Sequence, residues 1–127
     1  MRRGYSDEYR TKQLLVQQYG KDNVIKVAIG SFGADFLVLN KGRVVKVVEV
    51  KGTRKKAWHP SPREKEQLQR ILRFSQMHNC KAELWIWALS GGRKELEVVD
   101  VGGFVEGDVD GGRRCEKNKG KVQAMRL

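Results

Sequence analysis

The stretch VVEVKG, from Val47 to Gly52, is a run of β-branched residues interrupted by one acid and one base. Valine-rich runs of this kind predict a buried strand. Side chains two positions apart in a strand point to the same face, so Glu49 and Lys51 share one side of an otherwise apolar element. Burying charged groups is costly unless they have partners. The stretch therefore predicts a core strand whose end carries a functional site.

A second strand is predicted just upstream, from Asp35 to Leu39, and the run from Asn40 to Arg43 has the chemistry of a hairpin turn. This turn leads into the strand from Val44 to Lys51, so the two strands should pair antiparallel. In such a hairpin the start of one strand lies beside the end of the other. We therefore expect Asp35 and Glu49 to meet at one edge of the sheet.

Two carboxylates at one sheet edge suit a hard divalent cation, which prefers oxygen ligands. The carbonyl oxygen of Val50 is a further candidate ligand, and Glu8 offers another carboxylate from the first predicted helix. Lys51 shares the pocket of Glu49, where it can orient or deprotonate a water or neutralise charge growing on a phosphate. For Glu49 and Lys51 alone, a salt bridge on a solvated sheet face is the ordinary alternative. The addition of Asp35, Glu8 and a strongly basic composition favours the metal site.

Further helices and strands are predicted along the rest of the chain. Hydrophobic periodicity and cap chemistry predict a helix over Ser6–Gly20, a strand over Val24–Ala28, a helix from Ser61 to Asn79, and strands over Ala82–Leu89 and Leu96–Val101. The order α-β-β-β-α-β-β predicts an α/β fold, with a mixed β-sheet flanked by helices.

The sequences of three of these elements also predict how they begin or which faces they bury. In the first helix, capped by Ser6, Glu8 shares a stripe with Leu15 and Tyr19 that should face the sheet. The second helix opens with a capping box, Ser61 to Glu64. The strand over 82–89 is apolar on both faces, which predicts a central strand or a strand against a partner subunit.

The chain divides by composition at residue 101. Residues 1–101 are predicted to form one domain, and residues 102–127, rich in glycine and charged side chains, are expected to form a loose tail. A chain of 127 residues suits a single compact domain with a modest core.

The net charge of the chain indicates what kind of partner it binds. Lysine and arginine total 26 against 15 aspartate and glutamate, which gives a net charge of +11 and an isoelectric point near 10.0. An excess of this size on a small domain is typical of proteins that bind nucleic acid. The basic positions expected to contact DNA are Arg2 and Arg3 at the N-terminus and Arg54, Lys55 and Lys56 in the loop before the second helix. For that loop, an ordinary solvated loop with Trp58 packed on the body is the alternative.

No apolar run approaches the roughly 20 residues that span a bilayer, and no secretory signal follows Met1. The two cysteines, Cys80 and Cys115, form no zinc-binding pattern, and the sequence leaves open a disulfide between them. We expect a cytoplasmic protein that does not associate with membranes.

The pair of motifs Gly33-Ala34-Asp35 and Glu49-Val50-Lys51 resembles the bipartite metal-binding motif of the PD-(D/E)xK nuclease superfamily. Gly33-Ala34-Asp35 stands in place of the usual proline–aspartate. That superfamily has a restriction-endonuclease-like fold, which the resemblance implies for this chain.

More specifically, the chain resembles archaeal-type Holliday junction resolvases over residues 2–89. The matching segments are the opening from Arg2 to Glu8, the loop from Lys26 to Ser31, the strand end from Glu49 to Thr53, and the helix segment from Leu68 to Ser75. Lys26 departs from the arginine often found in that family, and the segment after Gly91 matches poorly.

The resemblance implies a Mg²⁺-dependent endonuclease, with Mn²⁺ as a substitute, that acts as a homodimer on two opposed strands of a four-way DNA junction. Carried over, the functional residues are Glu8, Asp35, Glu49 and Lys51 at the catalytic and metal site, with Ser31 and its helper Lys26 on the phosphate side. Two other functions stay open: a nuclease of the same fold acting on another DNA or RNA substrate, and a non-catalytic basic DNA-binding domain.

Overall fold

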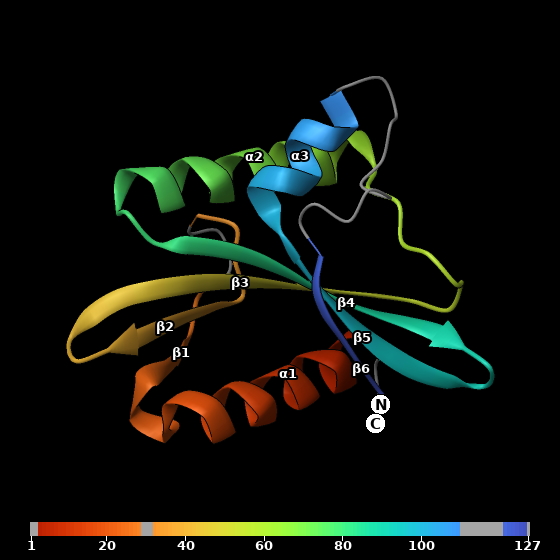
Figure 1. Cartoon of the computed structure of the whole chain (residues 1–127), viewed down its shortest axis with the longest axis horizontal. Helices are drawn as coiled ribbons and strands as arrows, with labels where there is room; N and C mark the ends of the chain where they lie inside the picture. Colours follow the sequence, from red (N-terminus) through yellow and green to blue (C-terminus); the bar gives the residue numbers. More distant parts are fainter. Residues whose placement is uncertain (1–2, 29–31, 110–120, 127) are drawn as a thin grey trace.

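The structure is a computed structural model that describes the backbone of residues 3–28, 32–109 and 121–126 and the side chains of residues 6–28 and 32–105. Helix α1 (Arg3–Tyr19) covers one face of a β-sheet, while α2 (Pro62–Met77) and α3 (Val101–Val109) cover the other (Figure 1). This arrangement confirms the predicted α/β fold with a sheet between helices. None of the helices in the described segments is long and apolar enough to cross a membrane.

The sheet has six strands in the described part of the chain, and their spatial order follows the sequence. The strands are β1 (Val24–Lys26), β2 (Phe36–Asn40), β3 (Arg43–Thr53), β4 (Lys81–Ser90), β5 (Arg93–Asp100) and β6 (Lys121–Arg126), with a short 3₁₀ turn, η1 (Lys21–Asn23), before β1. Only the β3–β4 pair is parallel. Helix α2 makes the crossover that a parallel pair requires.

The β2–β3 hairpin forms as predicted. Asn40 pairs with Arg43, and the two turn residues between them, Lys41 and Gly42, have φ angles of 55° and 79°. Positive φ at both central residues is the signature of the tight turn that matches strand twist. Phe36 pairs with Val48, so Asp35, the residue before β2, lies beside Val48 to Val50 of β3.

Strand β3 alternates between the two layers. Val48 and Val50 belong to the apolar core under α1, and Val47 belongs to the core under α2. Because side chains alternate along a strand, Glu49 and Lys51 face the α2 side together. This confirms that the acid and the base of VVEVKG share one face.

Strand β4 is central, as its apolar faces predict. It lies between β3 and β5, with Trp85 and Trp87 in the core under α1 and Leu84 and Ile86 in the core under α2. Trp87 is completely buried. Both tryptophans therefore belong to the hydrophobic core of this chain.

Helix α2 begins with the predicted capping box. Ser61 Oγ accepts from the Glu64 N–H at 3.2 Å, and Glu64 Oε1 accepts from the Ser61 N–H at 2.8 Å. At the other end, the His78 N–H donates to the last turn. Cys80 follows with a free thiol, whereas Cys115 lies outside the described residues.

Helix α1 differs from the prediction in its start and its buried face. It begins at Arg3 rather than after a Ser6 cap, and its buried stripe is Asp7, Thr11 and Leu15. Thr11 Oγ1 donates to the Asp7 carbonyl at 2.9 Å and accepts from Trp87 Nε1 at 2.9 Å. Hydrophobic periodicity misses this stripe because two of its residues are polar and obtain their hydrogen bonds inside the fold.

The expectation of a loose C-terminal tail is wrong for two segments, since residues 101–109 form α3 and residues 121–126 form β6. Val101 is fully buried, and Phe104 stacks on Trp58 with ring centroids 6.0 Å apart. Strand β6 pairs with β5 and covers its outer edge, which would otherwise be an exposed ladder of polar groups. The glycines and charges dominate the composition and obscure these apolar anchors. The division of the chain at residue 101 stays a prediction.

Candidate active site

Asp35 is fixed across the hairpin, immediately before β2. Its backbone N–H donates to the Val48 carbonyl at 2.9 Å, and its Oδ2 accepts from the Val50 N–H at 2.8 Å. The side chain is largely buried, with 18% of its surface exposed. The backbone register of the hairpin thus positions this carboxylate beside the end of β3.

Glu49 is a buried carboxylate with one unsatisfied oxygen. Its Oε2 accepts from Gln67 Nε2 at 2.9 Å and lies 3.2 Å from Lys51 Nζ. Its Oε1 is buried and has no hydrogen-bond partner among the described residues. A buried oxygen left without a donor lowers the stability of the fold by about 1–3 kcal/mol. A further partner is therefore expected for this atom.

The pKa of Glu49 is raised from 4.5 to about 8. Burial is the main cause, and repulsion from Asp35 is the second; the Lys51 ammonium opposes both. The carboxyl therefore favours its protonated form near neutral pH unless a cation joins the site. A divalent ion would supply both the missing partner and the missing charge.

Lys51 is held by three oxygen atoms on the α2 side. Its Nζ donates to Gln67 Oε1 at 3.0 Å and lies 3.2 Å from Glu49 Oε2 and 3.4 Å from Glu64 Oε2. It also lies 5.9 Å from the centre of the Trp58 ring. The ammonium is therefore fixed within the site rather than extended into solvent.

Gln67 on α2 is the residue that sequence reasoning missed. Its Nε2 donates to both the Gly33 carbonyl at 2.7 Å and Glu49 Oε2 at 2.9 Å, while its Oε1 accepts from Lys51. One side chain thus connects the loop before Asp35 with the acid and the base of β3. The sequence feature that could have revealed Gln67 is its position one turn before Ile71, where a polar residue falls on the buried stripe of the helix.

Glu8 reaches the site through Lys26, from the α1 side of the sheet. Lys26 Nζ lies 3.3 Å from Glu8 Oε1 and 3.6 Å from Asp35 Oδ1. The pKa of Glu8 is raised, first by burial and then by the charge of Asp35, with Lys26 acting in the opposite direction. Asp35 therefore lies between two other carboxylates, Glu8 and Glu49, on opposite sides of the sheet.

The residues present fit a hard divalent cation. Within the described residues, no group of three or more His, Cys, Asp or Glu side chains is arranged to hold a metal by side chains alone. Asp35 and Glu49 supply two carboxylates, and the unpaired Glu49 Oε1 is a free ligand atom. The N–H and C=O of a strand residue point to the same side, so the Val50 carbonyl faces the side on which its N–H binds Asp35. These oxygens, completed by water, suit Mg²⁺.

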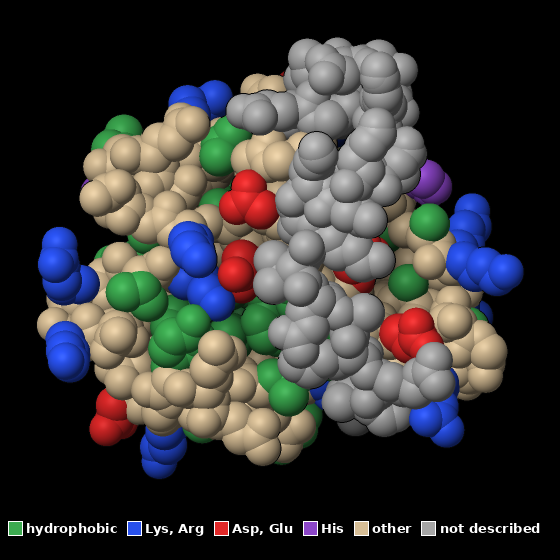
Figure 2. Space-filling model, viewed as in Figure 1, with side chains coloured by type: hydrophobic (Ala, Val, Ile, Leu, Met, Phe, Trp, Pro, Cys, Tyr) green, Lys and Arg blue, Asp and Glu red, His purple; other side chains and the backbone are tan. Residues whose placement is uncertain are grey.

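The structure describes only some of the residues predicted to contact DNA. Arg54, Lys55 and Lys56 are exposed in the loop between β3 and α2, while Trp58 packs on the body of the protein. Arg2 and Ser31 lie outside the described residues, as does the side chain of Arg3. Figure 2 shows Lys and Arg side chains around the edge of one face, with a few beside acidic side chains nearer its middle.

The mixed sheet between α1 and α2, with its parallel β3–β4 pair, has the topology of a restriction-endonuclease-like fold. A solved structure with this fold is that of Hjc, a Holliday junction resolvase from the archaeal hyperthermophile Archaeoglobus fulgidus. The two match with a TM-score of 0.53 and 14% sequence identity over 80% of this chain and 75% of that chain. No protein-family model matches the sequence, and a search of curated proteins finds no match. The resemblance seen in the sequence motifs therefore extends to the fold.

Proposed function

We propose that this chain is a Mg²⁺-dependent endonuclease that resolves four-way DNA junctions by cutting two opposed strands. The observation that carries the proposal is the buried Glu49, with Oε1 unpaired, between Asp35 and the fixed ammonium of Lys51. The restriction-endonuclease-like fold and the net charge of +11 support it.

Asp35, Glu49 and the Val50 carbonyl hold the Mg²⁺, and Mn²⁺ substitutes because it accepts the same oxygen ligands. The bound ion supplies Lewis acidity and lowers the pKa of its water. The Asp35 carboxylate keeps its orientation through the Val50 N–H at 2.8 Å. Glu8 adds negative charge at the margin of the site and keeps Lys26 in place.

Lys51 acts on the water and the phosphate. Its ammonium, restrained by Gln67 and Glu64, neutralises charge that grows on the scissile phosphate and orients the attacking water. Because Gln67 binds both Glu49 and Lys51, it keeps the acid and the base at a fixed separation before substrate arrives. Such preorganisation lowers the cost of reaching the transition state.

The proposed substrate is branched DNA, and the proposed assembly is a homodimer. A two-fold dimer presents two such sites to the two symmetric strands of a junction. The contacts predicted from the sequence are phosphate contacts by Ser31 and Lys26 and backbone contacts by Arg2, Arg3, Arg54, Lys55 and Lys56.

Two substitutions test the site. Asp35→Asn and Glu49→Gln remove one ligand charge each with little change of shape. We expect each to lower Mg²⁺-dependent cleavage of a labelled four-way junction by about 100-fold or more. Binding of the same junction in Ca²⁺ should stay within about twofold, because few phosphate contacts change.

Glu66→Gln is the matched control, since Glu66 is an exposed acid on α2. It should cut at the wild-type rate. If Asp35→Asn and Glu49→Gln also cut at that rate, the site is wrongly placed. Tight junction binding without any cleavage by the wild type would favour a binding protein instead.

A further inference from the structure

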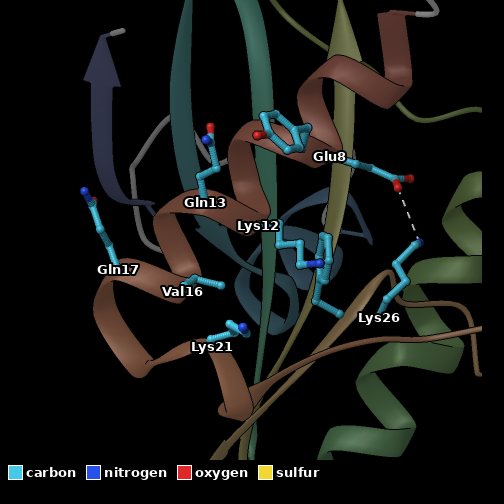
Figure 3. Close-up of a pocket in the computed structure, with 9 residues that line it drawn as sticks. Glu8, Lys12, Gln13, Val16, Gln17, Lys21 and Lys26 are labelled. Atoms are coloured by element: carbon cyan, nitrogen blue, oxygen red, sulfur yellow. Dashed lines mark ion pairs between the residues drawn. The ribbon is translucent and has the colours of Figure 1, made fainter.

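A groove of about 690 Å³ runs beside the proposed active site, between α1 and the edge of the sheet. Its walls are residues of α1, β1 and η1, and the half-buried Val16 forms its apolar floor above the buried Phe36. Figure 3 shows Glu8, Lys12 and Val16 along α1, with Lys26 opposite Glu8. Pockets of roughly 300–1,000 Å³ are the size that holds small-molecule ligands or parts of larger ones.

The groove is continuous with the active site. The Glu8–Lys26 pair, 3.3 Å apart, closes one end of it, and Lys26 also lies 3.6 Å from Asp35. A chain that passes over Asp35 at that end can therefore continue along α1 without leaving the protein surface.

The charged rim of the groove is cationic. Lys12, Lys21 and Lys26 line it against the single carboxylate of Glu8, which Lys26 already pairs. Lys12 and Lys21 are exposed, and neither has an ion-pair partner within the described residues. Two free ammonium groups above an apolar floor match a ligand that carries both phosphates and flat apolar faces.

Tyr9 adds an aromatic surface at the mouth of the groove. It is 54% exposed and follows Glu8 directly in α1. Nucleic acid bases stack on exposed aromatic rings, whereas bases inside a duplex are covered by their neighbours. The combination of exposed lysines and one exposed aromatic ring therefore favours an unpaired nucleotide.

We propose that this groove is a nucleotide subsite, which takes an unpaired nucleotide of the DNA strand next to the phosphate being cut. The proposal rests on the proposed nuclease function and deepens it. Lys12 and Lys21 bind the flanking phosphates, and the base stacks on Tyr9 above the floor formed by Val16. Such a subsite favours DNA whose bases are unstacked near the branch over continuous duplex.

The test measures binding without cleavage. A fluorescein-labelled short oligothymidylate, which has only unpaired bases, is titrated with the full chain in Ca²⁺ and followed by anisotropy. We expect Lys12→Gln/Lys21→Gln to weaken binding about fivefold to tenfold. Tyr9→Ala should weaken it about fivefold or more, through loss of stacking.

The matched control is Lys41→Gln/Lys81→Gln, which removes the same charge from exposed lysines outside the groove. A control pair that weakens binding as much as the groove pair would show general charge attraction and overturn the subsite. An unchanged affinity of Tyr9→Ala would overturn it as well. So would groove variants that dissociate a dimer but bind oligothymidylate normally, because the groove would then be an interface between copies.

A direct readout separates this inference from the proposed function. Oligothymidylate carrying 5-iodouridine should cross-link to Tyr9 on irradiation, with the adduct identified by mass spectrometry. Cross-linking without any junction cleavage would support the subsite and contradict the nuclease. Junction cleavage with cross-links only outside α1 would support the nuclease and overturn the subsite.

Discussion

At Glu49, burial and a neighbouring carboxylate link protonation to folding stability. Its pKa of about 8 in the folded protein lies above the usual 4.5, so the folded state binds this proton more tightly than the unfolded state. The stabilisation is therefore fully present below about pH 4.5 and is lost as pH rises through about 8. The proposed metal ion would remove this penalty, because a cation favours the ionised carboxylate.

We expect the free energy of unfolding in EDTA to fall between about pH 5 and pH 9, by at most about 5 kcal/mol from this group, since one pKa unit corresponds to about 1.4 kcal/mol. Urea unfolding monitored by tryptophan fluorescence measures the change. Glu49→Gln should flatten the profile, while Glu66→Gln should leave it as in the wild type. Equal slopes for the wild type and Glu49→Gln would contradict the assignment.

Gln67 acts through its neighbours rather than on the substrate. Gln67→Ala removes the donor to Glu49 and the acceptor for Lys51. We expect the Mg²⁺ concentration for half-maximal cleavage to rise about tenfold, the usual scale for groups that orient metal ligands. Metal titrations of the cleavage rate and calorimetry with Mn²⁺ measure the shift. Gln69→Ala, at an exposed site on the same helix, is the control, and an unchanged metal requirement for Gln67→Ala would exclude the positioning role.

Three elements meet at a buried ion pair close to the site. Asp7 on α1 is 2% exposed, and Lys94 on β5 donates to its two carboxylate oxygens at 3.1 and 2.9 Å. A Cβ added at Gly52 on β3 would collide with Asp7 Oδ2 and lie 3.2 Å from Lys94 Nζ. The glycine after Lys51 is therefore required for close approach of α1 and β3. Asp7 precedes Glu8 in the helix, so this contact also sets the position of Glu8.

We expect Gly52→Ala to destabilise the fold by about 1–3 kcal/mol, because the added methyl group displaces the Asp7–Lys94 pair. In an Asp7→Ala background the collision is absent, so the same substitution should cost less than about 0.5 kcal/mol. Urea unfolding of the wild type, both single variants and the double variant gives the coupling. Equal costs in both backgrounds would mean that the approach of α1 to Gly52 is not what excludes a side chain.

The elements predicted from the sequence are those whose signals are local. The hairpin follows from the turn at Lys41 and Gly42, and the start of α2 follows from Ser61 and Glu64, a few residues apart. The Asp7–Lys94 pair joins residues 87 positions apart, and no local pattern connects them. The order of elements and the shared face of the acid and the base were therefore predictable, whereas the buried stripe of α1 was not.

The same reason limits the prediction of the site. Asp35 and Glu49 belong to one hairpin, so the register of two adjacent strands places them together. Gln67 comes from another element, and its role depends on how α2 packs on the sheet. Glu8 was assigned to the site as a further carboxylate on the first predicted helix and by resemblance, and the structure places it 3.3 Å from Lys26, which also lies beside Asp35.

At the scale of the whole molecule, the sheet separates two groups of candidate functional residues. Glu49 and Lys51 contact Gln67 on the α2 side of the sheet. The α1 side carries Glu8 and the lysine-lined groove (Figure 3). Asp35 and Lys26 lie at the sheet edge between them. In the proposed function, a strand of DNA would be bound on one side of this edge and cut on the other. The net charge of +11 favours the binding of a polyanion such as the proposed DNA substrate.

The measurement that tests the central claim most directly uses the wild-type chain. A labelled synthetic four-way junction and a linear duplex of the same sequence are incubated with the protein in Mg²⁺ and in EDTA. We expect paired, symmetric nicks in the junction alone, and only with Mg²⁺. Equal cutting of both substrates would contradict junction selectivity, and an absence of cutting in Mg²⁺ would contradict the proposed nuclease.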